Sequence, residues 1–190
     1  MPEYSTTKPG LLLHVCCGTC ALYPYFMLKK DFDVTFFYYN PNIYPEKEYI
    51  KRLGDVKMIS DKYSVPLIIG RYETKKWFKL TEHLKQEPEG GARCGLCFRM
   101  RLDMTADKAE KLGFDLFGTT LTISPHKNHR IINSIGLELA VVKTSGFYRA
   151  NLKKNDGFKK TMELSKKLNL YRQNYCGCLY SIKIKSVLKS

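Results

Sequence analysis

Short apolar runs alternate along the chain with segments in which apolar residues recur every three or four positions. Continuous apolar runs are typical of strands in a sheet that is covered on both faces. They comprise residues 11–15, 33–39, 65–69, 116–123 and, more weakly, 139–142. Their alternation with helical segments predicts an α/β fold that is doubly wound, with a mostly parallel sheet and helices on both faces, of the Rossmann-like or nucleotide-hydrolase-like kind.

The predicted helices comprise residues 21–30, 45–63, 74–84, 95–112, 129–135 and 157–168. The segment 95–112 is the clearest, because one apolar stripe runs along it. The stripe consists of Phe98, Leu102, Ala106, Ala109 and Leu112. Gly113 follows directly, where the C-terminus of a helix favours glycine.

Polar residues and cysteines follow several of the predicted strands. Cys16 and Cys17 come after the first strand, and residues 40–42 come after the second. Thr119 and residues 124–127 belong to the end of the fourth. Ligands of open α/β sheets bind beyond the carboxyl ends of the strands. We therefore expect these residues to meet at one edge of the sheet, with the cysteines at the centre.

Length and charge narrow the class of protein. The chain has 190 residues and a net charge of +14. We expect one α/β domain, residues 1–190, with a flexible N-terminus at 1–10 and a C-terminal segment, about 150–190, packed on the rest. The positive charge predicts a polyanionic partner, with a generic basic surface as the alternative. The polar N-terminus and the lack of a long apolar run predict a cytoplasmic protein that does not enter a membrane.

The seven cysteines are gathered in three short segments of the chain. These are Cys16, Cys17 and Cys20, then Cys94 and Cys97, then Cys176 and Cys178. Disulfide frameworks belong to small secreted domains, so clustered thiols in a chain of this kind indicate metal or redox chemistry.

Four of these thiols have the spacing of a metal site. Cys94 and Cys97 form a CxxC pair at the start of a predicted helix, whose N-terminus favours negative sulfur. Cys16 and Cys17 provide two further ligands. Four thiolates fit a zinc ion or a [4Fe–4S] cluster, and adjacent cysteines suit the larger cluster better. Cys20 is either a core thiol or a further ligand.

Cys176 and Cys178 are separated by one glycine and differ from the other pairs. They can close a small, strained disulfide, and strained disulfides are the labile, catalytic kind. A second metal half-site and two independent thiols are the alternatives.

Other polar residues near the cysteines have open roles. His14 is a core histidine bonded to backbone or a proton donor. Arg101 lies four residues after Cys97, where it lowers the pKa of a thiol, holds a phosphate or is a solvated side chain. Asp103 and Glu89 are among the candidate acids, with several tyrosines. No phosphate-binding loop or glycine-rich dinucleotide motif is present, which argues against use of ATP.

The chain resembles the epoxyqueuosine reductases of the QueH family along nearly its whole length. Five segments carry the resemblance: HVCCGTC at 14–20, YNPNIYP at 39–45, GARCGLCF at 91–98, TISP at 122–125 and LYRQNYCGC at 170–178. Two positions depart from the family pattern. Gly18-Thr19 stands where the family usually has Ala-Pro, and Asn151-Leu152 stands where it tends to have Asp-Phe.

The resemblance implies reduction of epoxyqueuosine to queuosine at the wobble position of tRNA, without cobalamin. It implies a [4Fe–4S] cluster on Cys16, Cys17, Cys94 and Cys97, and a redox-active disulfide between Cys176 and Cys178. The partners implied are an anticodon stem-loop and an external electron donor. The expected tRNA contacts are Arg93, Arg101, Lys127, Arg130, Lys153, Lys154 and Arg172. A mononuclear iron beside the cluster is a further hypothesis, with His14, Cys20 and Asp103 as its ligands or as the acid.

Two other functions fit parts of this pattern. One is a tRNA sulfur-transfer enzyme with an iron–sulfur cluster, against which the missing phosphate loop counts. The other is a zinc-stabilised RNA-binding module without catalysis, which leaves the separate Cys176 and Cys178 pair unexplained.

Overall fold

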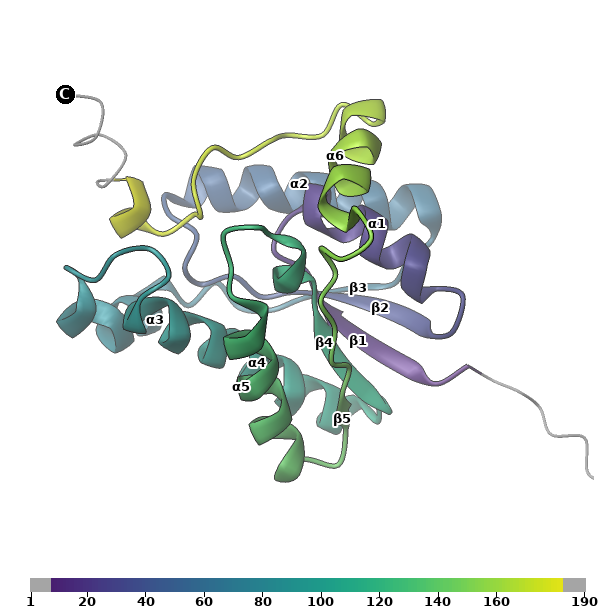
Figure 1. Ribbon diagram of the computed structural model, residues 1–190, viewed down its shortest axis with the longest axis horizontal. Helices are drawn as coiled ribbons and strands as arrows, with labels where there is room; N and C mark the ends of the chain where they lie inside the picture. The colour runs from purple at the N-terminus through teal and green to yellow at the C-terminus, as the bar shows by residue number, and fades with distance from the viewer. Residues whose placement is uncertain (1–7, 183–190) are drawn as a thin grey trace, which may run out of the picture.

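The computed structural model describes residues 8–182, which contain a five-stranded sheet in the order β3-β2-β1-β4-β5 (Figure 1). All neighbouring strands are parallel. The strands are β1 (Gly10–His14), β2 (Asp33–Tyr38), β3 (Leu67–Ile69), β4 (Leu116–Thr119) and β5 (Gly146–Phe147). The predicted parallel α/β fold is thus confirmed.

Helices cover both faces of this sheet (Figure 1). They are α1 (Gly18–Leu28), α2 (Glu46–Tyr63), α3 (Thr74–Thr81), α4 (Ala92–Leu112), α5 (His129–Val141) and α6 (Gly157–Lys167), with short 3-10 turns at Glu82–Leu84 and Thr120–Ile123. Helices α1, α2 and α6 lie on one face, α4 and α5 lie on the other, and α3 packs against α4.

Alternate residues of the central strands enter two cores. Leu11 and Leu13 pack in the core beneath α1 and α2, whereas Leu12 and Phe117 pack in the core beneath α4 and α5. This alternation follows from the two-residue period of a strand, and both faces are apolar because both are covered. The apolar stripe of α4 is buried as predicted except for Leu112, and Gly113 ends the helix with a φ of 73°.

Two of the predicted strands were assigned wrongly in whole or in part. Residues 139–142 do not form a strand, because α5 continues to Val141 with Leu139 buried on its apolar face. The fifth strand is the short β5 instead. Strand β4 ends at Thr119, whose hydroxyl accepts a hydrogen bond from the Leu121 backbone at 3.1 Å and so starts a 3-10 turn.

The segment after α6 returns along α2 to the carboxyl edge of the sheet (Figure 1). The Tyr171 backbone N–H donates to Asp55 of α2 at 2.8 Å, and the Tyr171 hydroxyl donates to Glu48 at 3.0 Å. The predicted flexible N-terminus falls largely on residues 1–7, which lie outside the described residues, as do 183–190. None of the helices within residues 8–182 has the length and apolar character needed to cross a membrane.

Candidate metal and redox site

Two adjoining cavities lie beyond the carboxyl ends of the strands, where the sequence predicts a site. One, here called the polar cavity, has a volume of about 500 Å³ and is lined by Cys16, Cys20, Asn40 and Asn42, among others. The other, the thiol cavity, has a volume of about 310 Å³. The residues that line both are Asn42, Glu89, Arg101, His126, Lys127 and Cys176. The predicted convergence at one edge of the sheet is therefore confirmed.

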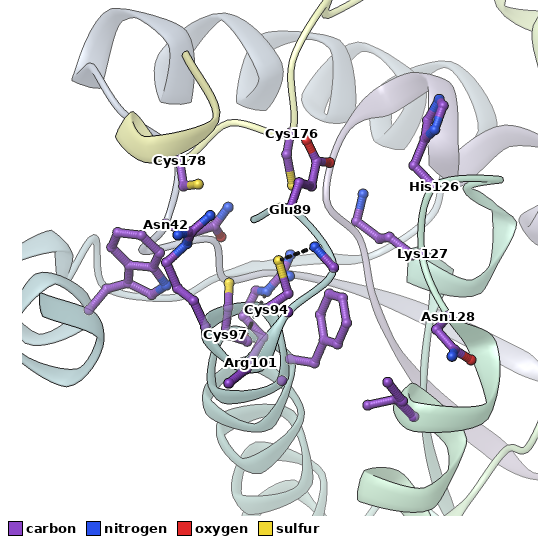
Figure 2. Close-up of a pocket in the computed structure, with 18 residues that line it drawn as sticks. Asn42, Glu89, Cys94, Cys97, Arg101, His126, Lys127, Asn128, Cys176 and Cys178 are labelled. Atoms are coloured by element: carbon purple, nitrogen blue, oxygen red, sulfur yellow. Dashed lines mark hydrogen bonds between the residues drawn. The ribbon is translucent and has the colours of Figure 1, made fainter. Parts of the chain in front are cut away.

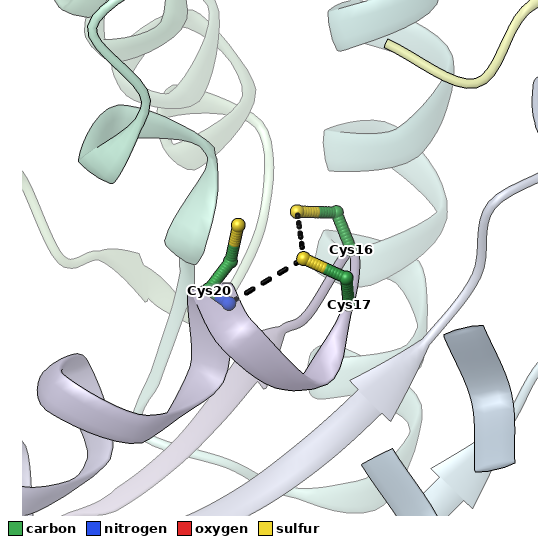
Figure 3. Close-up of side chains that lie close together, drawn as sticks. All are labelled: Cys16, Cys17 and Cys20. Carbon is green, nitrogen blue, oxygen red and sulfur yellow. Dashed lines mark hydrogen bonds between the residues drawn. The ribbon is translucent and has the colours of Figure 1, made fainter. Parts of the chain in front are cut away.

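Cys16, Cys17 and Cys20 form a cluster between β1 and α1 (Figure 3). Their sulfur atoms all lie within 4.8 Å of one another, close enough to share one metal ion. Cys17 is the N-cap of α1, and its sulfur accepts a hydrogen bond from the Cys20 backbone at 3.4 Å. Gln173 donates to the same sulfur at 3.2 Å. Cys20 thus belongs to the thiol cluster rather than to the apolar core.

Hydrogen bonds among these three cysteines lower the pKa of one thiol and raise the pKa of the other two. The thiols of Cys17 and Cys20 donate toward Cys16 and hold its pKa well below its usual range. Donation to Cys16 raises the pKa of Cys17 to about 12 and also raises that of Cys20. Cys16 is therefore the thiol that loses its proton most readily, and Cys17 and Cys20 must also lose protons if they bind a metal.

Cys94 and Cys97 lie in the first two turns of α4 and line the thiol cavity (Figure 2). The Gly90 backbone donates to the Cys94 sulfur at 3.2 Å. Burial raises the pKa of Cys97 to about 11, against an opposing effect of Arg101. The positive charge of Arg101 therefore favours the thiolate form that a metal requires.

Arg101 is inside the protein and lines both cavities, so any contact that it makes with tRNA lies within these cavities, and its contact with tRNA stays a prediction. It is only 2% exposed, and its Nε donates to the Cys97 carbonyl at 3.2 Å. Its Nη2 has no hydrogen-bond partner among residues 8–182. Because Arg101 lines both cavities, it places a buried positive charge between the two groups of thiols.

Arg93 is also buried, at 1% exposure, and it lines the thiol cavity, so its contact with tRNA stays a prediction. Its Nη1 donates to the carbonyl oxygens of Leu84, Lys85 and Glu87. Arg93 therefore fixes the loop before α4, which carries Glu89 to the cavities.

Cys176 and Cys178 approach the cavities from the C-terminal segment and are free thiols. Cys176 is half-buried and lines both cavities, whereas Cys178 is buried and lines the thiol cavity alone. The Cys178 sulfur donates to the Ser181 hydroxyl at 3.5 Å. The four sulfurs of Cys94, Cys97, Cys176 and Cys178 surround the thiol cavity in Figure 2.

The candidate acids His14 and Asp103 differ in burial, and neither lines the two cavities. His14 is fully buried, with Nδ1 at 2.9 Å from the Thr119 hydroxyl and Nε2 at 3.1 Å from the Tyr39 carbonyl. Burial, and secondarily the charge of Arg101, lowers the pKa of His14 to about 4, so His14 is a neutral core histidine and not an acid. Asp103 is exposed and lines neither cavity.

Glu89 supplies the one carboxyl group among the described residues that line the two cavities. Figure 2 draws its side chain with Cys176 among the residues that line the thiol cavity. Lys127 lines both cavities as well, and nearby sulfurs raise its pKa although burial opposes the charged form. An acid and an ammonium group therefore face the same space as the cysteines.

The remaining expected tRNA contacts lie around these cavities or on the surface. Arg172 is exposed and lines the polar cavity. Arg130 and Lys154 are exposed, whereas Lys153 donates to the carbonyl oxygens of Ser124 and Lys127. Sequence reasoning missed the wall of the polar cavity that α6 forms. Phe158, Thr161 and Met162 line it, and their spacing of three and four residues was the available signal.

The donor set fits a thiolate-bound metal or cluster. Three sulfurs lie together at the start of α1, and four more surround the adjoining cavity. Thiolates are the ligands of structural zinc and of iron–sulfur clusters. Arg101 between the two groups supplies positive charge to offset that of several thiolates.

A family model and individual related proteins match the chain along most of its length and carry the same name. The family model described as epoxyqueuosine reductase QueH matches residues 11–184. Proteins named epoxyqueuosine reductase QueH are similar to the chain. That of Streptococcus pyogenes is 37% identical over 97% of this chain and 75% of its own length. That of Thermotoga maritima is 38% identical over 90% of each.

Two solved structures share the fold. A predicted tRNA methyltransferase subunit from Methanocaldococcus jannaschii has a TM-score of 0.56 at 12% identity and covers 83% of this chain and 76% of its own. The U34-tRNA thiolase NcsA from Methanococcus maripaludis, with its [4Fe–4S] cluster, has a TM-score of 0.56 at 10% identity and covers 96% of this chain and 65% of its own. At these identities the likeness concerns the fold alone.

Proposed function

Because the chain belongs to the epoxyqueuosine reductase QueH family, we propose that it reduces epoxyqueuosine to queuosine at the wobble position of tRNA, the last step of queuosine biosynthesis. The observation that carries this proposal is the family match over residues 11–184, which includes every cysteine that lines the two cavities.

We propose that Cys16, Cys17, Cys94 and Cys97 hold a [4Fe–4S] cluster. The charge of Arg101 supports this assignment, because this buried cation interacts with Cys16, Cys94 and Cys97 and favours their thiolate forms. Such a cluster, when bound, supplies electrons singly. Of the residues considered for a mononuclear iron beside it, Cys20 is the one with a sulfur in the site, so the proposal keeps Cys20 alone.

The cysteines of the C-terminal segment supply the right number of electrons and protons. Conversion of the epoxide to an alkene breaks both C–O bonds, forms a carbon–carbon double bond and releases water, which requires two electrons and two protons. Oxidation of the Cys176 and Cys178 thiols to a disulfide provides both. An external electron donor then reduces the disulfide for the next turnover. Cys176 is the member of the pair that lines both cavities, so we assign it the contact with substrate.

Residues around Cys176 assist removal of the oxygen. We propose that Glu89 donates one of the two protons to the oxygen as the ring opens and regains a proton from the thiols as they are oxidised, because its carboxyl group lines both cavities with Cys176. The positive charges of Lys127 and Arg101 face the same space and stabilise negative charge that develops on that oxygen.

The surface surrounding this site suits an RNA substrate. The chain has a net charge of +14, and Arg130, Lys154 and Arg172 are exposed. We propose that these three residues form part of the positive surface that binds the anticodon stem-loop. Lys127, which lines both cavities, and Lys153, which is bonded to the loop that carries Lys127, complete this surface. We further propose that residues 1–190 form one domain and that the protein acts in the cytoplasm, where free thiols persist.

A bacterial strain that lacks its own epoxyqueuosine reductase tests the function directly. Expression of the chain should replace epoxyqueuosine by queuosine in the nucleosides of digested tRNA, as measured by mass spectrometry. Unchanged epoxyqueuosine, with the protein present in the cells, would argue against the proposed reaction.

A zinc-stabilised RNA-binding module remains a second candidate, because three sulfurs within 4.8 Å of one another also fit a zinc ion. Metal analysis after anaerobic purification separates the two. Iron and sulfide with a brown colour support the reductase, whereas zinc without iron supports the binding module.

A further inference from the structure

The polar cavity has walls with an unusual number of buried polar atoms that lack partners. Such atoms are rare in folded proteins, because a buried donor or acceptor without a partner is unfavourable. Five residues with such an atom line this cavity: Asn40, Asn42, Arg101, Thr161 and Gln173. Each of these atoms lacks a hydrogen-bond partner among residues 8–182. Their concentration in one place offers hydrogen-bonding positions to a polar ligand.

The orientation of two of these side chains is fixed by contacts behind them. Asn40 Nδ2 donates to the Val15 carbonyl at 3.0 Å, which leaves Asn40 Oδ1 as the unpartnered atom. Gln173 Nε2 donates to the Cys17 sulfur at 3.2 Å, which leaves Gln173 Oε1 unpartnered. Both free atoms are acceptors, as is Asn42 Oδ1. A ligand that pairs with these three oxygens therefore carries several hydroxyl or N–H donors.

A second wall of the same cavity is largely apolar. Phe158, Thr161 and Met162 of α6 line it from one face of the helix. Phe158 is 36% exposed, which is a large value for an aromatic side chain beside a cavity. Aromatic and methionine side chains offer flat, polarizable surface to a planar ring. The wall formed by α6 thus suits a heterocyclic base.

The size and position of the cavity fit one nucleotide. Its volume of about 500 Å³ lies within the usual range for small-ligand sites, roughly 300–1,000 Å³. Glu89, Lys127 and Cys176 line it where it adjoins the thiol cavity, so a bound ligand extends toward the redox pair. The exposed Arg172 provides positive charge for a flanking phosphate.

We propose that the polar cavity is the pocket for a single nucleotide turned out of an RNA loop, with its base against Phe158 and Met162 and its donor groups on Asn40, Asn42 and Gln173. The proposal rests on the proposed function in identifying the nucleotide as the modified wobble residue. It adds that α6 and the polar side chains of this cavity recognise that residue, next to Cys176, which lines the same cavity.

The test compares two anticodon stem-loops that differ only in carrying epoxyqueuosine or guanosine at the wobble position. Fluorescence anisotropy gives the Kd of each with anaerobically purified protein. Wild-type protein should bind the modified RNA more tightly, and Phe158→Ala should bind the modified RNA about tenfold less tightly than wild-type protein, as expected for the loss of one base–aromatic contact. Phe158→Trp should retain the wild-type affinity for the modified RNA, and Ile50→Ala, at an exposed position on α2, should not alter this affinity.

Thr161→Val is a second test, in which a loss of affinity for the modified RNA cannot be caused by unfolding. The valine side chain has nearly the same shape and removes a buried hydroxyl without a partner, so thermal stability should not fall. Affinity for the modified RNA should nevertheless fall, because the hydroxyl contact with the ligand is lost. Unchanged affinity and preference in both Phe158→Ala and Thr161→Val would overturn the pocket assignment.

The same preparations keep this proposal distinct from the proposed function. If wild-type protein forms queuosine while both variants keep the wild-type affinity for the modified RNA, the pocket assignment fails and the reductase stands. If wild-type protein neither forms queuosine nor distinguishes the two RNAs, the reductase assignment fails and the pocket assignment fails with it.

Discussion

Arg52 Nη1 lies 3.1 Å from the carbonyl oxygen of Cys176 and donates a hydrogen bond to it. The same guanidinium group donates to the Tyr175 carbonyl at 3.3 Å and to Glu48 at 2.8 Å. Arg52 is 2% exposed and belongs to α2, which packs against α1. The backbone entering the Cys-Gly-Cys segment is therefore fixed to the same layer of helices that carries the first thiol cluster.

Gly177→Ala tests this attachment. Gly177 has a φ of 119°, and a Cβ there would lie 3.0 Å from Arg52 Nη1 and 3.2 Å from Ile43. We expect the substitution to lower the free energy of unfolding by about 1–3 kcal/mol and to reduce turnover, because the cysteines on either side are displaced.

Urea unfolding and tRNA reduction measure the two effects. Gly54→Ala on α2 is the control, since a Cβ there meets nothing within 4 Å and alanine favours a helix. Equal behaviour of the two variants would contradict the role of the Arg52 contact.

Arg101→Met should weaken metal binding without weakening the fold. Burial raises the pKa of Cys97 to about 11 and Arg101 opposes that rise, so removing the positive charge raises the thiol pKa further. Metal binding requires thiolates, so the pH at which half of the protein binds Co²⁺ should move upward, by about one unit.

Thiolate-to-cobalt absorption across a pH series gives this midpoint. Arg99→Met, two residues earlier on α4, replaces an arginine that pairs with Glu138 on the surface and should leave the midpoint unchanged. An Arg101→Met protein with the wild-type midpoint would show that Arg101 does not act on the metal site.

His14 should make stability depend on pH below neutrality. Its pKa is lowered to about 4 in the folded protein from 6.5, because burial disfavours the charged form. Between these pH values His14 binds a proton more readily in the unfolded chain than in the folded protein. The contribution of neutral His14 to the free energy of unfolding is therefore fully present above about pH 6.5 and is lost as the pH falls toward 4. The loss amounts to about 3 kcal/mol.

Chemical denaturation from pH 7 to pH 4 measures this slope. His14→Gln should flatten it, whereas His83→Gln, at an exposed position, should not. A slope that is the same in all three proteins would mean that His14 is not neutral in the fold.

Glu89→Gln separates proton donation from binding. Glutamine keeps the shape of the side chain that lines both cavities but carries no transferable acid proton. We expect kcat for tRNA reduction to fall by about 10²–10⁴ while the Kd for tRNA stays within about twofold. Glu87→Gln is the matched control on the same loop. Full activity in Glu89→Gln would assign the proton to another group.

The sequence predicts the sheet and the meeting of the cysteines because both follow from local patterns. Apolar runs mark β1 to β4, and parallel strands bring their carboxyl ends to one edge. The strand β5 escaped prediction because it has two residues and no apolar run. Leu139 was assigned to a strand because its apolar neighbours hide the helical period of α5.

Burial of charged side chains was harder to foresee. Arg101 lies three residues after Phe98 and so shares the buried face of α4. Residue type alone predicts an exposed side chain, because arginine is rarely fully buried. The nucleotide pocket could not be assembled from the sequence at all. Its walls come from α6 and the loops after β1 and β2, and their approach depends on tertiary packing between α1 and α6.

The most direct test of the central claim is a single-turnover reaction without added reductant. Protein purified anaerobically, loaded with iron and sulfide and fully reduced is mixed with an excess of tRNA that carries epoxyqueuosine, and the nucleosides are measured by mass spectrometry. The account predicts queuosine in proportion to protein together with oxidation of Cys176 and Cys178, and no second turnover until reductant is added. Cluster-loaded protein that leaves epoxyqueuosine intact, both before and after a reductant is supplied, would contradict it.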